Sequence, residues 1–283
     1  MVRFAFAAIA TSCMGATILF SACGDSTFSS SPSASDAQAD TSVTDASSAS
    51  DSASDAAGVV VDAGRITPID CADASHSLCD TFDEMSLSKI WIVNAACSDP
   101  FLDTSKSVSA PSSFATSDLA SAAGCASAYA NVVSVGSTHF SSSFDLLLDS
   151  PSSGTYAPFF AIWVTTSDYS FYEIALNEEA PGALKLLENL SFTDGGSTFE
   201  VTPINAANLA PNAWNHVAIA INFSGPNVVN ITVGDDNPVT LTLKHRPSGG
   251  TISAYRVYLG IPNGGVGFKA AAHFDDFVSD VTP

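Results

Sequence analysis

Apolar and polar residues alternate strictly in several segments of the second half of the chain. Between residues 139 and 148, Phe140, Phe144 and Leu146 fall on one face of an extended chain, while serine, histidine and aspartate fall on the other. Residues 216–223 repeat the pattern with valine, isoleucine and phenylalanine. A period of two is typical of a β-strand that buries one face. The pattern therefore predicts half-buried strands of an antiparallel sheet.

Two further segments complete the expected architecture. Residues 229–233 and 239–243 alternate on either side of an Asp-Asp-Asn turn sequence, which predicts a β-hairpin. Residues 157–164 are apolar on both faces and predict a central strand. Residues 183–189 fit a helix as well as a strand, and residues 118–124 allow one helical turn. Frequent Gly, Pro and Asn turn signals leave no room for long helices, so we predict an all-β antiparallel sandwich.

The beginning of the chain follows a different pattern. Arg3 precedes an apolar and small-residue run from Phe4 to Phe20, and Ser21-Ala22 precede Cys23. These are the parts of a secretory signal peptide, and the run is too short and too rich in small residues for a permanent membrane span. The sequence Leu19-Phe20-Ser21-Ala22-Cys23 resembles the lipobox of bacterial lipoproteins, which implies lipid attachment at Cys23. An ordinary signal peptide followed by an unrelated cysteine is the alternative.

A low-complexity segment of Ser, Ala, Asp and Thr follows the cysteine and has no cation before Arg65. Such a composition cannot bury enough apolar surface to order itself, so it predicts a disordered tether. The predicted organisation is a lipoprotein signal peptide (1–22), the lipidated cysteine with its linker (23–66), and one β-sandwich domain (67–283). Gly24 directly after the cysteine favours the outer membrane, so we expect an exported protein anchored to the cell envelope.

The formal net charge of −20 limits the classes of partner. Nucleic acids and anionic lipid surfaces need a basic patch, whereas the few Lys and Arg residues here are scattered singly. We therefore exclude nucleic acid as a partner and expect contact with the membrane only through the lipid. A glycan or an envelope or surface protein is the expected partner.

Four cysteines remain after those of the signal peptide and the lipidation site: Cys71, Cys79, Cys97 and Cys125. An even number in an exported protein predicts disulfides. Three pairings are open, and we favour Cys71 with Cys79 and Cys97 with Cys125 because each closes a local loop. The spacing lacks the close Cys or His pairs of a zinc site.

Four motifs resemble the laminin-G-like branch of the concanavalin A-like lectin and glucanase jelly rolls. They are the opening strand Cys79-Asp80-Thr81-Phe82-Asp83, the strand Trp214-Asn215-His216-Val217-Ala218, the hairpin turn Val233-Gly-Asp-Asp-Asn-Pro-Val239 and the closing strand Phe274-Asp275-Asp276-Phe277-Val278. The turn departs from the family in having Gly-Asp in place of Asp-Gly. The resemblance covers residues 79–281 and implies a jelly roll in which the opening and closing strands pair. Members bind glycans, adhere to proteins or, in other branches, hydrolyse glycosides, so the fold alone does not choose.

The hydrolytic branch uses an E-x-D-x-x-E strand, and no such run occurs in this sequence. Glycoside hydrolysis requires two carboxylates that flank one bond. Glu173, Glu178 and Glu179 are the acidic residues near one predicted strand, and we expect them to be solvated charges on an exposed face. The sequence also lacks the serine-nucleophile, zinc-protease and phosphate-loop motifs.

Ligand binding would use exposed aromatic rings beside polar groups. The rings to draw from are Trp163, Tyr169, Tyr172, Tyr255 and Tyr258, and we predict the ligand-binding residues to be Trp163, Tyr169, Tyr172 and Glu173. The resemblance also implies a structural calcium ion between the first and last strands, with Asp83, Glu84, Asp275 and Asp276 as its ligands. The alternative is that these carboxylates face water or accept backbone N–H bonds.

Three functions remain open from the sequence. The favoured one is a membrane-anchored lipoprotein that presents a non-catalytic β-sandwich for carbohydrate or protein binding. The second is a glycoside hydrolase of the same fold with an atypical carboxylate pair. The third is a purely structural protein of the envelope.

Overall fold

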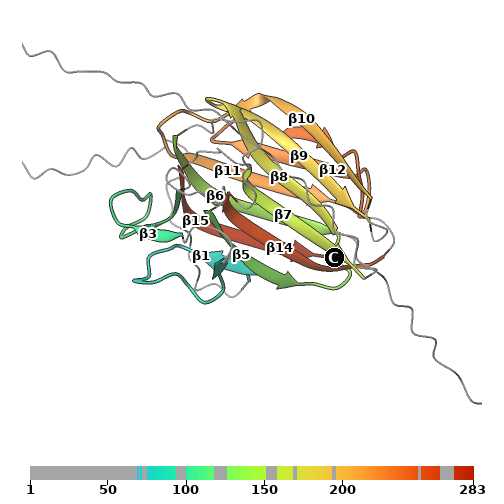
Figure 1. The fold of residues 1–283 in the computed structure, drawn as a ribbon, viewed down its shortest axis with the longest axis horizontal. Coiled ribbons are helices and arrows are strands. Elements are labelled where there is room, and N and C mark those ends of the chain that lie inside the picture. Colours follow the sequence, from blue (N-terminus) through green and yellow to red (C-terminus); the bar gives the residue numbers. More distant parts are fainter. Residues whose placement is uncertain are drawn as a thin grey trace, which may run out of the picture. The chain divides into compact units, whose positions relative to one another are not determined.

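The computed structural model describes residues 69, 71, 75–93, 100–117, 126–150, 158–167, 171–192, 196–247, 250–261 and 271–283 (Figure 1). The lipidation site Cys23, the cysteines Cys97 and Cys125, and Tyr169 lie outside these residues. So does the single helical turn considered at residues 118–124. In the described part of the chain every regular element is a β-strand, and no helix is long and apolar enough to span a membrane.

The strands form two antiparallel sheets. Sheet A has the strand order β13-β12-β11-β6-β15-β4-β3, and β1 also pairs with β15. Its strands are β1 (Leu78–Asp80), β3 (Phe101–Asp103), β4 (Ser113–Ser117), β6 (His139–Ser150), β11 (Asn215–Asn222), β12 (Val228–Val233), β13 (Val239–Thr242) and β15 (Ala271–Thr282).

Sheet B has the order β10-β9-β8-β7-β14-β5-β2, and Figure 1 shows β9, β8, β7 and β14 side by side. Its strands are β2 (Ile92–Val93), β5 (Ala126–Val133), β7 (Pro158–Thr166), β8 (Phe171–Ala180), β9 (Ala183–Ser191), β10 (Ser197–Asn208) and β14 (Ile252–Ile261). The apolar strand β7 lies in the middle of this sheet, which confirms the predicted central strand.

The core lies between the two sheets and is built from the residues whose alternation the sequence shows. On sheet A, Phe144 contacts Phe160 of sheet B with ring centroids 4.8 Å apart. The hairpin is confirmed as β12 and β13, with Val229 opposite Leu241. Residues 183–189 form strand β9, which settles the choice that periodicity left open. An all-β antiparallel sandwich of the jelly-roll type is therefore confirmed.

Candidate functional site

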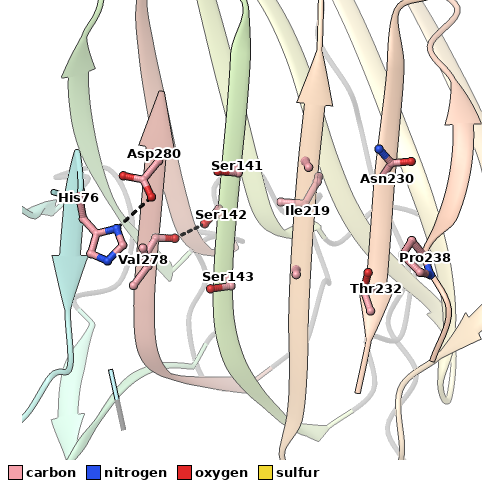
Figure 2. Close-up of a pocket in the computed structure, with 12 residues that line it drawn as sticks. His76, Ser141, Ser142, Ser143, Ile219, Asn230, Thr232, Pro238, Val278 and Asp280 are labelled. Carbon is pink, nitrogen blue, oxygen red and sulfur yellow. Dashed lines mark hydrogen bonds and ion pairs between the residues drawn. The ribbon is translucent and has the colours of Figure 1, made fainter. Parts of the chain in front are cut away.

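Each sheet turns one face to the core and the other outward, so the two outer faces are the places to look for a site. Sheet A bears a hollow of about 660 Å³ on its outer face (Figure 2). Its floor consists of small side chains that lie opposite one another, Ser143 with Ala218 and Ser141 with Ala220. Asn230 and Thr232 of β12 border it on one side.

The opposite rim of this hollow is closed by a histidine and an aspartate. Nδ1 of His76 lies 2.9 Å from Oδ2 of Asp280, and the backbone N–H of Ser77 donates to Oδ1 of the same carboxylate at 2.9 Å. The described lining contains no Trp, Tyr or Phe side chain. The hollow therefore offers hydroxyl groups, an amide and the hydrogen-bonded His76–Asp280 pair beside aliphatic side chains, but no large aromatic ring on which a sugar could stack.

The outer face of sheet B has a different chemistry. One row of side chains crosses six neighbouring strands, each residue directly opposite the next: Phe199 (β10), Asn189 (β9), Glu173 (β8), Trp163 (β7), Arg256 (β14) and Asn131 (β5). We call these six residues the central row. At the usual spacing of neighbouring strands the row spans about 24 Å.

Aromatic rings accompany the central row. The ring centroid of Trp163 lies 4.7 Å from that of Tyr258 and 5.5 Å from that of Phe171. Tyr258 in turn lies 5.2 Å from Tyr129 on β5. Small and aliphatic residues on β7, β8 and β9 complete this second apolar cluster, which is separate from the core between the sheets. Trp163 and Tyr129 remain half-buried, so their rings are partly open to solvent.

Arg256 is held firmly among these rings. Its Nε donates to Oδ1 of Asn131 at 2.9 Å, and Nη1 donates to the hydroxyl of Tyr258 at 3.2 Å. Its guanidinium carbon lies 4.5 Å from the centroid of the Tyr129 ring, a cation–π distance. Burial raises the pKa of Tyr258, and the charge of Arg256 partly counters that rise. The phenol therefore stays neutral and keeps its hydrogen at neutral pH.

Glu173 is the carboxylate of the central row, and it is more deeply buried than we expected from the sequence. It is only 3% exposed, and Nδ2 of Asn189 donates to its Oε2 at 3.3 Å. The expectation of a solvated, exposed charge is therefore wrong for Glu173. It is also wrong for Glu178, which is 5% exposed and accepts a hydrogen bond from the backbone of Gly182. Because Glu178 is paired with the core residue Leu184, it lies on the core side of β8, away from Glu173.

One predicted ligand-binding residue must be corrected. Tyr172 is 0% exposed and points into the core, where its hydroxyl donates to Glu188. Since neighbouring residues of a strand face opposite sides, Tyr172 cannot share a surface with Glu173. Tyr255 is likewise in the core and donates to the carbonyl of Ser137 at 2.7 Å. Trp163, Glu173 and Tyr258 are thus the candidates that the structure brings together on one face.

The sequence interpretation missed Arg256 and Tyr129. A signal for Arg256 was present, because Tyr255, Val257 and Leu259 alternate with Arg256 and Tyr258 in strand β14. The alternation shows that the arginine and Tyr258 share a face. It does not show that this face meets Trp163 and Tyr129, since that depends on the order of the strands and their register.

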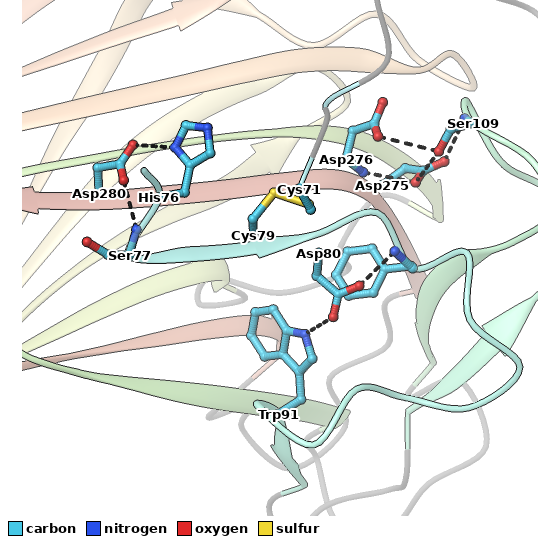
Figure 3. Close-up of a disulfide and its surroundings, with 11 residues drawn as sticks. Cys71, His76, Ser77, Cys79, Asp80, Trp91, Ser109, Asp275, Asp276 and Asp280 are labelled. Atoms are coloured by element: carbon cyan, nitrogen blue, oxygen red, sulfur yellow. Dashed lines mark hydrogen bonds and ion pairs between the residues drawn. A yellow bond between two sulfur atoms is a disulfide. The ribbon is translucent and has the colours of Figure 1, made fainter. Parts of the chain in front are cut away.

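The opening and closing strands pair as the resemblance implies, with Cys79 opposite Val278. Figure 3 shows the surroundings of Cys79. The structure joins Cys79 to Cys71 by a disulfide, the first of the two local pairings favoured from the sequence. Beyond the disulfide, Asp80 accepts hydrogen bonds from the backbone of Phe82 and from Nε1 of Trp91, each at 2.8 Å. These contacts tie β1, which pairs with β15 of sheet A, to the segment that leads into β2.

The carboxylates proposed as calcium ligands lie in different surroundings. Oδ2 of Asp275 accepts from the backbone N–H groups of Val108 and Ser109, at 2.7 and 3.0 Å (Figure 3). Glu84 is exposed. Among the described residues no group of three or more His, Cys, Asp or Glu side chains is arranged to hold a metal ion. Calcium at Asp83, Glu84, Asp275 and Asp276 therefore stays a prediction from the sequence.

Comparisons with known proteins find similarity in structure only. No protein-family model matches the chain, and no curated protein matches its sequence. A Bacteroides ovatus GH16 protein for mixed-linkage glucan, solved with its product, is 8% identical with a TM-score of 0.46, over 72% of this chain and 99% of that one. A β-1,3-glucanase from Mycobacterium marinum is 11% identical with a TM-score of 0.42, over 73% and 99%. An endo-β-1,4-glucuronan lyase from the fungus Trichoderma reesei is 11% identical with a TM-score of 0.41, over 74% and 92%.

These proteins share a β-sandwich with the chain, but at such identities and TM-scores the likeness carries no information on ligand or chemistry. Sandwiches of this kind serve unrelated functions, so function has to be argued from the side chains of the site.

Proposed function

We propose that the outer face of sheet B binds a glycan, and that the domain is a non-catalytic carbohydrate-binding domain. The observation that carries the proposal is the central row, in which Trp163 lies between the carboxylate of Glu173 and the guanidinium of Arg256. Sugar rings have apolar faces bordered by hydroxyl groups. Their recognition therefore combines stacking on aromatic rings with hydrogen bonds to a few polar side chains.

The direction of the central row fits a chain of sugars laid across the strands. Amides lie on both sides of the charged residues, at Asn189 and Asn131. At the far end, Phe199 of β10 is 51% exposed and offers another ring. A row of about 24 Å can contact several successive sugar units, so we expect affinity to rise with the length of the oligosaccharide.

Hydrolysis of the bound glycan is the alternative function. It requires two carboxyl groups on either side of the glycosidic bond, roughly 5 to 9.5 Å apart. Glu173 supplies one, whereas Glu178 lies on the core side of the same strand. We therefore favour binding without hydrolysis. New reducing ends released from a bound polysaccharide, and lost in Glu173→Gln, would establish the enzyme instead.

We propose further that a lipid on Cys23 anchors the domain to the cell envelope, with the outer membrane as the expected location. The support is the lipobox-like sequence that ends the signal peptide and the acidic linker that follows it. A flexible, charged linker would hold the glycan-binding face away from the membrane surface.

The first experiment is a glycan array with the full-length protein, run with and without calcium, followed by titration of the selected oligosaccharide into wild type and Trp163→Ala. We expect Trp163→Ala to weaken binding at least about tenfold, because a Trp at the centre of an interface typically contributes about 2 kcal/mol or more. Phe101→Ala is the matched control, because Phe101 is an exposed ring on sheet A.

The two variants together test whether the glycan binds at the central row. Unchanged affinity in Trp163→Ala, with Phe101→Ala also unchanged, would place the site elsewhere on the molecule. An array on which the folded wild-type protein binds no glycan would contradict the proposal and favour a protein partner or a structural role.

A further inference from the structure

Arg256 carries a positive charge that no carboxylate of the described residues neutralises. Its partners are the amide of Asn131, the phenol of Tyr258 and the rings of Tyr129 and Trp163, and all of them are neutral. Lys106, in contrast, is paired with the carboxylate of Asp149 at 2.6 Å. Glu173, the acid of the central row, is two strands away, which places the two backbones about 10 Å apart.

The hydrogen bonds of Arg256 leave part of its guanidinium free to bind. A guanidinium has five N–H donors, and the bonds to Asn131 and Tyr258 use Nε and one hydrogen of Nη1. Both hydrogens of Nη2 and the second of Nη1 have no partner in the described part of the chain. Two adjacent donors of this kind form the fork that binds a carboxylate through two parallel hydrogen bonds.

We infer that the glycan bound by the central row is acidic, and that Arg256 binds the carboxylate of a uronic acid. The inference rests on the proposed function and specifies its ligand. A half-buried cation without a counter-ion is unfavourable, whereas a uronic acid brings a counter-ion on the same molecule as the sugar ring that stacks on Trp163. Asn131 and Tyr258 then act as positioning residues that hold the guanidinium plane.

Because the whole chain is acidic, recognition of a uronic acid has to come from direct contact with Arg256. With a net charge of −20 the protein repels polyanions at long range, so binding cannot come from general electrostatic attraction. Salt screens charges that are farther apart than about 8 Å at physiological ionic strength but acts less on a contact pair. Affinity for a uronic acid oligomer should therefore hold or rise between low and physiological salt. Binding by ion exchange on a basic patch would instead weaken steeply as the salt concentration rises.

The test compares one ligand with and without its carboxylates. Oligogalacturonates and oligoglucuronates, and the same oligomers with the carboxyl groups reduced to alcohols, are titrated into the full-length protein. For at least one of the two series we expect the acidic oligomer to bind at least about tenfold more tightly, the effect of a hydrogen bond to a charged group. A sulfated oligomer of the same length shows whether the site requires a carboxylate or any anion.

Three variants assign the preference to Arg256. Arg256→Gln should bind the acidic and the reduced oligomer equally, and Arg256→Lys should keep only part of the preference because an ammonium lacks the planar fork. Arg246→Gln is the matched control, because Arg246 lies outside the central row and donates to the carbonyl of Gly225. It should retain the full preference.

The outcomes separate this inference from the proposed function. Equal binding of both oligomers to wild type, tighter binding of the sulfated oligomer, or a preference that survives in Arg256→Gln would overturn the inference and leave glycan binding intact. Binding of none of these oligomers by a protein that binds other glycans on the array would also overturn the inference, whereas an array on which the folded protein binds no glycan would contradict the proposed function itself. If Arg256→Gln does not fold, the comparison of the two oligomers on wild type still decides.

Discussion

Asp275 is a carboxylate with no exposed surface, on the closing strand β15. It accepts hydrogen bonds from the backbone of Val108, the backbone and hydroxyl of Ser109, and the backbone of Asp276. Burial raises its pKa to about 7, although these hydrogen bonds favour the charged form. Asp275 thus fixes the loop before β4 to the last strand, in a protonation state that changes near neutral pH.

The raised pKa predicts a specific dependence of stability on pH. A carboxyl group whose folded pKa lies above its unfolded value of 3.8 binds its proton more tightly in the folded state. Its contribution to stability is therefore full at low pH and is lost as the pH rises from about 4 to about 7. Relative to Asp275→Asn, which cannot titrate, wild type should lose on the order of 2 to 4 kcal/mol of unfolding free energy between pH 4 and pH 8.

Denaturant unfolding of both proteins at several pH values measures this difference. Ser109→Ala serves as the control, because it removes a hydrogen bond to Asp275 but keeps the carboxyl group, and its stability should fall with rising pH at least as much as that of wild type. Parallel curves for wild type and Asp275→Asn would show that the carboxylate stays charged throughout.

At the scale of elements, the alternation of side chains determines which face of each strand is buried, and this part of the fold could be predicted. Phe140 and Phe144 of β6 and Ile219 of β11 lie in the core as expected. The register of neighbouring strands could not be predicted, because alternation within one strand says nothing about the residue opposite. The central row depends entirely on register, so Trp163 and Glu173 were found from the sequence while their neighbour Arg256 was missed.

The disulfide acts on a single element, the short strand β1. It joins Cys71 and Cys79, which are 8 residues apart, and the loop it closes contains His76. The double variant Cys71→Ser/Cys79→Ser should lower the unfolding free energy by about 2 to 3 kcal/mol, because the unfolded chain gains the freedom of an open loop. Serine variants are preferable to reduction, since reduction would also act on the other cysteines. An unfolding midpoint equal to that of wild type would show that the bridge constrains neither state.

At the scale of the whole molecule, the acidic predicted linker and the β-sandwich domain differ in composition and in the role we propose for each. Asp residues of the predicted linker contribute seven negative charges with no cation before Arg65. From this composition we expect a self-repelling linker that stays extended and that its negative charge would keep off an anionic membrane surface. In the folded domain, in contrast, the residues proposed to bind the glycan lie on one face of sheet B. If a lipid on Cys23 attaches the chain to a membrane, as we propose, a glycan-binding face on such a linker would reach polymers that lie beyond that membrane.

The proposed attachment to a membrane requires a lipid on Cys23, and the variant Cys23→Ser tests this directly. Wild type expressed in a bacterial host that processes lipoproteins should partition into the detergent phase and the membrane fraction, because two or more acyl chains give stable attachment. Cys23→Ser should appear in the aqueous phase with its glycan affinity unchanged, since Cys23 lies far along the chain from the central row. Cys13→Ser, within the signal peptide, is the matched control and should partition like wild type. Wild type and Cys23→Ser both in the aqueous phase would mean that the signal peptide ends in an ordinary cleavage and that the domain reaches its glycan as a freely diffusing protein.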